Sequence, residues 1–159
     1  MDLTNKTILI TGATDGIGKV LAEEFSKLGS NIILLGKNSS KLDTVYDQLD
    51  HSFDSQKHLI LEADLSLLNN ESAHEILRAI SNEYNALDGI IHNAAILGTM
   101  TPLEDYELSK WDEVLNINLR APFLLTKTLK SILENSTMPR IIFTSSGVAN
   151  TGRAFWGAY

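Results

Sequence analysis

The chain reads TILITGATDGIG over residues 7–18, a short apolar run followed by a turn that holds three glycines. A helical pattern begins directly after this turn. Glycine lets the backbone turn tightly and approach a ligand, while the free N–H groups and dipole of the following helix attract a phosphate. Glycine-rich turns also occur as plain connectors. Because this turn joins a strand to a helix near the N-terminus, it predicts a dinucleotide-binding site.

Composition narrows the classes of function. The chain has 159 residues, 43% of them hydrophobic, which suffices for one domain with a core. Its formal net charge is −7 and it has no cluster of lysine and arginine, so small molecules rather than nucleic acids are the expected partners. The absence of cysteine excludes disulfides, thiol nucleophiles and cysteine-bound zinc.

The sequence predicts neither a metal site nor contact with a membrane. The four histidines lack the spacing of metal ligands. The N-terminal residues lack the basic and then apolar pattern of a signal peptide, and no apolar run reaches membrane-spanning length. We therefore expect a cytoplasmic protein, and the lack of cysteine fits a reducing compartment.

Short apolar runs alternate with amphipathic stretches along the chain. The runs, rich in β-branched residues as in strands buried on both faces, cover residues 8–10, 32–35, 59–61, 89–91 and 141–143. Helices are expected between them, over residues 17–28, 40–49, 76–84 and 109–133. This alternation predicts an α/β fold, a doubly wound and mostly parallel Rossmann sheet with helices on both faces. No linker or repeat divides it, so residues 1–159 are expected to form a single dinucleotide-binding domain.

Two of the expected helices carry specific signals. In the first, one face is expected to pack inward, and Gly29 is expected to end the helix; that face carries Ile17, Val20, Leu21, Phe25 and Leu28. In the last, Ser109 and Asp112 resemble an acidic capping box.

The ligand of such a sheet lies beyond the carboxyl ends of its strands, so the residues that follow each run are candidates. Lys37 follows the second run, where an NAD site usually places an acidic side chain on the ribose. A lysine can instead pair with the 2′-phosphate of NADP, so NADP is favoured over NAD. The alternative is a solvated loop lysine. Asp15, within the glycine turn, adds nothing for a phosphate.

The residues after the third and fourth runs leave two interpretations open. Asp64 and Leu65 suit an adenine, through its exocyclic amine and its ring, but Asp64 can equally cap a turn. The small residues Ala94 and Ala95 permit a ribose to approach the backbone, while Asn93 can bind the ligand or tie neighbouring strands together. The candidate cofactor-binding residues are Gly12, Thr14, Asp15, Gly16, Ile17, Gly18, Lys37, Asp64, Leu65, Asn93, Ala94 and Ala95.

Together these motifs resemble the short-chain dehydrogenase/reductase family. The resemblance spans the chain and rests on the glycine turn, Asp64-Leu65, Asn93-Ala94-Ala95, residues 116–119 (NINL) and Ser145-Ser146. Ser146 and Tyr159 stand thirteen residues apart, as the catalytic serine and tyrosine of the family do. More narrowly, residues 34–38 and 152–159 resemble the YciK-type bacterial oxidoreductases, a subgroup of the family.

The resemblance implies a catalytic role for three residues. Tyr159 would exchange a proton with the substrate oxygen while NADPH delivers hydride to a carbonyl carbon, or the reverse for a secondary alcohol. Ser146 would hold that oxygen. A phenol titrates near pH ~10, so the family lowers its pKa with a lysine four residues further on.

Asn118 is the third of these residues. Pro122 has no N–H to donate to the carbonyl of Asn118, and in the family this free oxygen holds a water on the proton path. The alternative is a simple helix kink, which would account for Pro122 but not for an asparagine one turn before it.

The sequence ends at Tyr159, before the position of that lysine. We therefore expect a Rossmann domain that is incomplete at its C-terminus, inactive by itself, and a homo-oligomer when full length. The alternative function is a non-catalytic, nucleotide-binding relative that acts as a sensor or scaffold.

Overall fold

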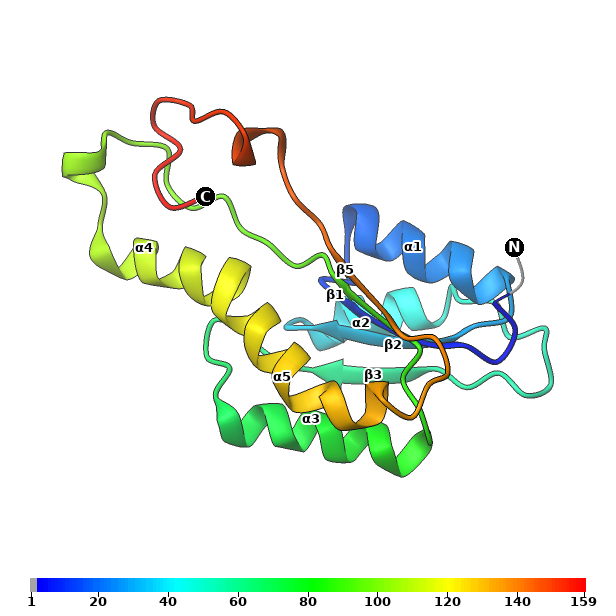
Figure 1. Cartoon of the computed structure of the whole chain (residues 1–159). Helices are drawn as coiled ribbons and strands as arrows, with labels where there is room; N and C mark the ends of the chain where they lie inside the picture. Colours follow the sequence, from blue (N-terminus) through cyan, green and yellow to red (C-terminus); the bar gives the residue numbers. More distant parts are fainter. Residues whose placement is uncertain (1–2) are drawn as a thin grey trace.

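A computed structural model describes residues 3–159 of the chain; Met1 and Asp2, with which the predicted domain begins, lie outside the described residues. Five parallel strands form one sheet in the order β3-β2-β1-β4-β5 (Figure 1). The strands are β1 (Thr7–Thr11), β2 (Asn31–Gly36), β3 (Leu59–Glu62), β4 (Gly89–His92) and β5 (Arg140–Phe143). The doubly wound α/β fold predicted from the alternation of runs and helices is confirmed.

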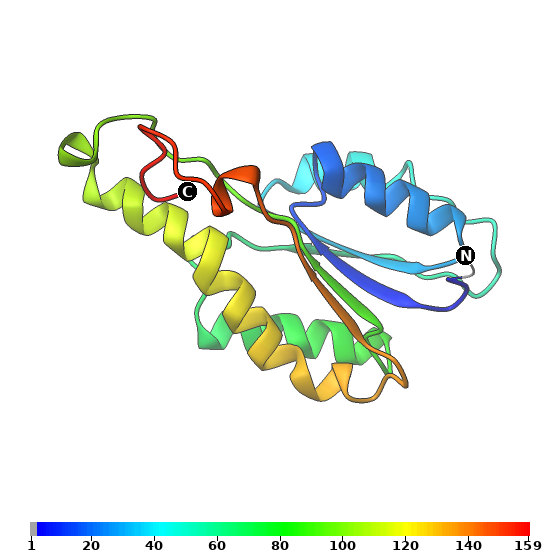
Figure 2. The same cartoon turned by 45° about the horizontal axis from the view of Figure 1, so that its top comes forward.

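Helices cover both faces of this sheet. In Figure 2, α1 (Gly16–Lys27) and α2 (Ser39–Tyr46) lie on one face, and α3 (Asn70–Glu83) and α5 (Ala121–Leu133) lie on the other. Successive strand residues point to opposite faces, so Ile8 and Ile10 pack toward the first pair of helices, whereas Leu9 packs toward the second. After β3 the chain crosses to the other side of β1, and this change of direction lies between β1 and β4. Ligands of such sheets bind at this switch point.

Helix α1 packs through small residues together with only some of the bulky ones expected. Its buried positions are Gly18, Ala22 and Ser26, four residues apart on one stripe. Leu21 and Phe25 are partly buried and pack against the core, as predicted. Ile17 is 63% exposed and Val20 is 55% exposed, so the prediction that both face the core is wrong. The small stripe lets the helix axis approach the sheet closely. The end of the helix is as predicted, with Gly29 at φ +86° directly after the C-cap Leu28.

The last expected helix contains an interruption. Helix α4 (Leu108–Leu115) leads into a π-helical turn, η2 (Asn116–Arg120), before α5 begins. The predicted capping box at its start is wrong, because Glu107 occupies the N-cap and its side chain makes no capping bond. A π turn places one extra residue in the helix, and Pro122, which cannot donate a backbone hydrogen bond, follows it at the start of α5.

Strand β5 differs from the other strands in burial. The pattern of apolar residues predicts strands buried on both faces, and β1 and β4 are buried throughout. In β5 all four residues are exposed, with Phe143 at 59%. It lies at an edge of the sheet and pairs with β4 alone, but β3, at the other edge, is mostly half-buried. No helix within residues 3–159 is long and apolar enough to cross a membrane.

Candidate functional site

A cavity of about 420 Å³ opens where the strands of the sheet end, at the switch point. Most of the predicted cofactor-binding residues line it: Gly12, Thr14, Asp15, Gly16, Lys37, Asp64, Leu65, Asn93, Ala94 and Ala95. Residues separated by up to 83 positions in the sequence therefore meet at one place. Two predicted residues lie outside this lining: Ile17 points to solvent, and Gly18 is buried behind the turn.

Glycine is required at two positions of the turn for reasons of space. A Cβ atom built on Gly18 would overlap the carbonyl oxygen of Gly12. A Cβ built on Gly12, which has φ +64°, would lie 2.8 Å from the Cα of Ala94. The turn is thus pressed against the segment that follows β4. Its Gly12 and Ala13 N–H groups donate to the carbonyl of Leu35, and the Gly16 N–H donates to the Asp15 side chain, which caps α1. A glycine turn at the start of a helix is nevertheless the kind of cradle at which proteins bind phosphates.

Asn93 ties the segment after β4 to the end of β1. Its Nδ2 donates to the carbonyl oxygens of Thr11 at 3.3 Å and Gly12 at 3.4 Å. The Thr11 hydroxyl accepts the N–H groups of Asn93 and Ala94, both at 3.0 Å, and donates to the carbonyl of Ile91. Of the two interpretations of Asn93, the structure shows the one in which it joins neighbouring strands.

Charged groups frame the part of the cavity next to β2 and β3. Lys37 is exposed at the end of β2, and Lys41 on α2 pairs with Asp15 at 3.7 Å. Asp64 accepts the N–H and hydroxyl of Ser66 on Oδ1, at 2.9 and 2.7 Å, so it does cap a turn. The Ser66 hydroxyl lowers the pKa of Asp64, and the nearby charge of Lys37 acts in the same direction. The carboxyl is therefore ionised at neutral pH.

Asn118 anchors the π turn to the segment after β4. Its Nδ2 donates to the carbonyl of Ile96, and its Oδ1 accepts the N–H of the same residue, each at 2.9 Å. The side chain therefore pairs with Ile96 as a neighbouring strand would. Ile117 of the same turn lines the main cavity, whereas Asn118 lines an adjoining apolar cavity of about 370 Å³ with Phe123 and Phe143.

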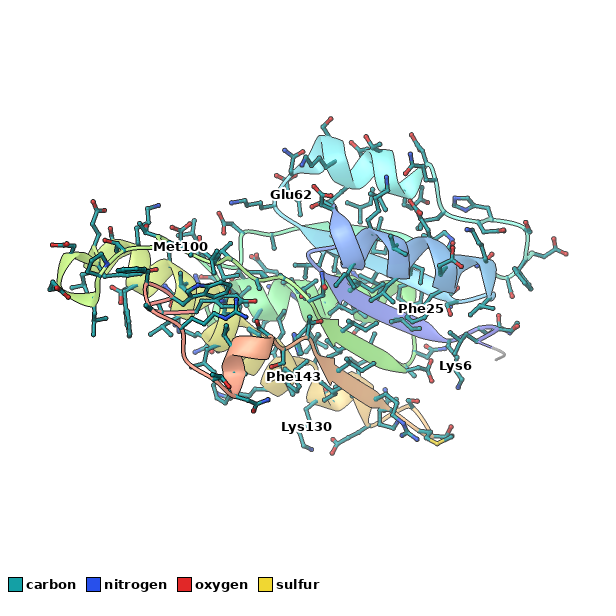
Figure 3. All side chains as sticks on the ribbon, turned by 90° about the horizontal axis from the view of Figure 1, so that it is seen from above. Lys6, Phe25, Glu62, Met100, Lys130 and Phe143 are labelled. Carbon is teal, nitrogen blue, oxygen red and sulfur yellow. The ribbon has the colours of Figure 1, made fainter. Side chains whose placement is uncertain are left out.

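Ser146 and Tyr159 lie beyond the sheet, on the segment that follows β5. The Ser146 hydroxyl caps the short 3₁₀ turn η3 (Gly147–Ala149) by accepting the N–H of Val148 at 3.4 Å. Tyr159 is 39% exposed and its ring meets that of Trp156 at 5.7 Å. Within residues 3–159 no hydrogen bond or ring contact joins Ser146 to Tyr159, so the structure does not assemble them as a pair. Figure 3 shows the labelled Phe143 where β5 leaves the sheet, and the C-terminal segment lies near the labelled Met100.

Several residues of the site were not among those predicted. Gly36, Ala63, Ile96 and Ile117 line the cavity, and each stands beside or inside a predicted motif, so widening each motif by one residue would have found most of them. His92, the last residue of β4, is 4% exposed, pairs through Nε2 with the Thr126 hydroxyl at 2.9 Å and stacks on Phe143. His92 lines neither the main cavity nor the apolar one, so it packs beside the site rather than in it.

Comparisons with known proteins agree with this geometry. The family model described as short chain dehydrogenase matches residues 6–159. The chain is 36% identical to the uncharacterized oxidoreductase YciK of Escherichia coli K12, over 99% of this chain and 62% of that protein. A short chain dehydrogenase of Escherichia coli CFT073, solved in complex with NADPH, superposes with a TM-score of 0.92 at 37% identity, covering 99% of this chain and 66% of that one. A short chain dehydrogenase of Shigella flexneri, solved in complex with NADP, superposes with a TM-score of 0.92 at 38% identity, covering 99% of this chain and 66% of that one. The chain thus spans less than two thirds of these relatives.

Proposed function

Because the chain belongs to the short chain dehydrogenase family, we propose that its cavity binds NADP and that the full-length protein is an NADP-dependent oxidoreductase of carbonyls and secondary alcohols. The observation that carries the proposal is the glycine cradle with the exposed Lys37 at its rim. Glycines and a helix N-terminus suit the pyrophosphate, and a lysine at the end of β2 suits a 2′-phosphate better than a ribose hydroxyl. Two similar structures that contain NADPH or NADP support the same cofactor, and NAD is the less favoured one.

Each part of the cavity suits one part of the cofactor. Asp64 has one carboxylate oxygen committed to Ser66, which leaves Oδ2 to accept from an adenine amine, with Leu65 beside the ring. Ala94 and Ala95 add little bulk where a ribose would approach the backbone. Lys37 would pair with the 2′-phosphate as a charge-assisted contact. The N–H groups at the start of α1 would hold the pyrophosphate.

The proposed chemistry needs a proton donor beside a hydride donor. The nicotinamide, when bound, supplies the hydride. Tyr159 would give its phenol proton to the substrate oxygen, and Ser146 would hold that oxygen by a hydrogen bond. Pro122 has no N–H to donate to the carbonyl of Asn118 four residues before it, so this oxygen could hold a water that returns protons to the site. The side chain of Asn118, already paired with Ile96, fixes the position of its own carbonyl.

Replacing the phenol hydroxyl tests the proposed reaction. Full-length protein should consume NADPH with members of a carbonyl panel, followed by the loss of NADPH absorbance. Tyr159→Phe should lower kcat by at least about a hundredfold, because the proton donor is removed, and should leave NADPH binding intact. Tyr46→Phe, at the end of α2, is the matched control and should keep full activity.

Two outcomes would overturn this assignment. Activity of Tyr159→Phe near that of the parent protein would mean that another group donates the proton. NADPH binding without turnover of any panel member would instead favour a non-catalytic protein that binds nucleotides as a sensor or scaffold.

A further inference from the structure

The side chain of Tyr106 fills a slot between two glycines that come from distant parts of the chain. A Cβ built on Gly98, in the segment after β4, would overlap the phenol oxygen of Tyr106. A Cβ built on Gly157, in the C-terminal segment, would lie 2.6 Å from its Cδ2 and overlap the neighbouring ring carbon. Any side chain at either position would therefore occupy the space that the Tyr106 side chain fills.

Backbone conformation adds a second reason for glycine at these positions. Gly98 has φ +76° and Gly157 has φ +22°, a region that other residues rarely adopt. Gly98 is further confined by Val114 of α4, whose Cγ2 would lie 2.6 Å from an added Cβ. The close approach to Tyr106 is thus part of the local chain path on both sides.

Tyr106 is itself held firmly by its own part of the molecule. Its hydroxyl accepts the N–H of Thr99 at 3.2 Å, and its backbone N–H donates to the carbonyl of Leu103 at 3.2 Å. The ring meets Trp111 of α4 edge to face, with centroids 5.9 Å apart. The Tyr106 ring therefore forms a fixed platform at the start of α4, against which Gly157 rests.

The C-terminal segment is braced so that the position of Gly157 determines that of Tyr159. The N–H of Tyr159 donates to the carbonyl of Trp156 at 3.1 Å, and the N–H of Trp156 donates to Arg153 at 3.3 Å. The guanidinium of Arg153 stands 5.5 Å from the centroid of the Trp156 ring, which in turn meets the ring of Tyr159. Figures 1 and 2 both show this segment beside the one between β4 and α4.

From this geometry we propose that Tyr106 is a positioning residue for Tyr159: its ring docks the C-terminal segment through Gly157 and thereby sets the location of the proposed proton donor. The positioning role rests on the proposed function, in which Tyr159 is the proton donor. The docking of Gly157 on Tyr106 does not depend on that function. Tyr106 is distinct from the proposed proton donor, because it stands before α4 and acts here through its ring, while its hydroxyl accepts the N–H of Thr99.

Tryptophan fluorescence tests the docking without any activity. The 159-residue chain has two tryptophans, so Trp111→Phe leaves Trp156 as its single reporter, next to Gly157, and keeps an aromatic ring beside Tyr106. In that background Tyr106→Ala should increase quenching of Trp156 by acrylamide and shift its emission to the red, because the segment is released into solvent. Tyr106→Phe keeps the ring and should retain the docked signal, and Tyr46→Ala should leave it unchanged. An unchanged Trp156 signal in Tyr106→Ala would overturn the proposal.

Substituting the glycine tests the same contact from the other side. Gly157→Ala should release the segment as Tyr106→Ala does, while Gly152→Ala, whose added Cβ meets nothing within 4 Å, should not. In the Tyr106→Ala background Gly157→Ala should have little further effect, because the overlap is gone. Strictly additive effects of the two changes would contradict the contact, and these variants decide the matter even if one of the tyrosine variants fails to fold.

Turnover by full-length protein tests the positioning role. Tyr106→Ala should lower kcat and leave the dissociation constant of NADPH unchanged, because Tyr106 lies outside the cofactor cavity, and Tyr106→Phe should restore kcat. Released fluorescence with an unchanged kcat would show that the docking serves another purpose and would overturn the positioning role. If the parent protein shows no turnover, the proposed function fails, and the fluorescence result still decides the docking.

Discussion

His92 is a buried base whose environment opposes a positive charge. Burial lowers its pKa from 6.5 to about 4, and its Nδ1 has no hydrogen-bond partner among the described residues. Between pH 6.5 and about 4 the imidazole of His92 is protonated in the unfolded chain but stays neutral in the folded chain. The free energy of unfolding should therefore fall as the pH is lowered from 6.5 toward 4, by at most about 3 kcal/mol from this residue.

Urea unfolding at neutral and mildly acidic pH measures this effect. His92→Gln, which keeps a polar atom for Thr126, should flatten the pH dependence. Part of the dependence should remain, because burial also lowers the pKa of His58, which adds to the loss in the same direction. His74→Gln, on the exposed face of α3, is the control and should keep the full dependence. An equal slope in His92→Gln and the parent chain would refute the assignment.

At the scale of single residues, sequence indicated which side chains reach the site but not what they do there. Asp64 and Asn93 each had two open interpretations, and the structure shows the bonds of the structural one for both. Their places after apolar runs identify them, because the ends of parallel strands converge at one edge. Hydrogen-bond partners such as Ser66 and Thr11 depend on tertiary distances that no local pattern contains.

Among the elements, the π turn η2 depends on the side chain of Asn118. This amide supplies both a donor and an acceptor to Ile96, so Asn118→Asp would place a carboxylate oxygen against the Ile96 carbonyl. The loss of that donor should cost about 1–3 kcal/mol of unfolding free energy. Asn116→Asp, in the same turn, is the control and should cost clearly less. Equal losses in the two variants, measured by urea unfolding, would rule out a special role for the pairing.

Element types could be predicted from sequence, whereas their faces and interruptions could not. The runs and amphipathic stretches predicted all five strands close to their observed positions. Helix α3 begins at Asn70, six residues before the start expected for it, and the helix expected over 109–133 is divided by the π turn. The predicted face of α1 was right for Leu21 and Phe25 but wrong for Ile17 and Val20. Hydrophobicity marks all four, while close packing on the sheet selects the small residues of the helix. Pro122 marked the irregular part of the last helix, but the pairing of Asn118 with Ile96 inside the π turn is a tertiary contact that the local pattern does not contain.

For the molecule as a whole, one half of the proposed site is assembled and the other is not. The glycine turn and the ends of β2, β3 and β4 converge on one cavity, as the doubly wound topology requires. Ser146 and Tyr159 lie on the segment beyond β5 and are not brought together, and the chain covers 62% of the length of YciK. The cavity therefore offers the direct test, since ten of the proposed cofactor-binding residues line it.

We propose that this cavity prefers NADP to NAD, a preference that titration of the chain with NADPH and with NADH measures. NADPH should bind at least about tenfold more tightly, because Lys37 gains a charge-assisted contact with the 2′-phosphate. Lys37→Asp should make NADH the tighter ligand. Lys57→Asp makes the same change of charge just before β3, at the end of the sheet away from the cavity, and should preserve the preference for NADPH. Equal affinities for NADPH and NADH in the parent chain, or an unchanged preference in Lys37→Asp, would contradict the account.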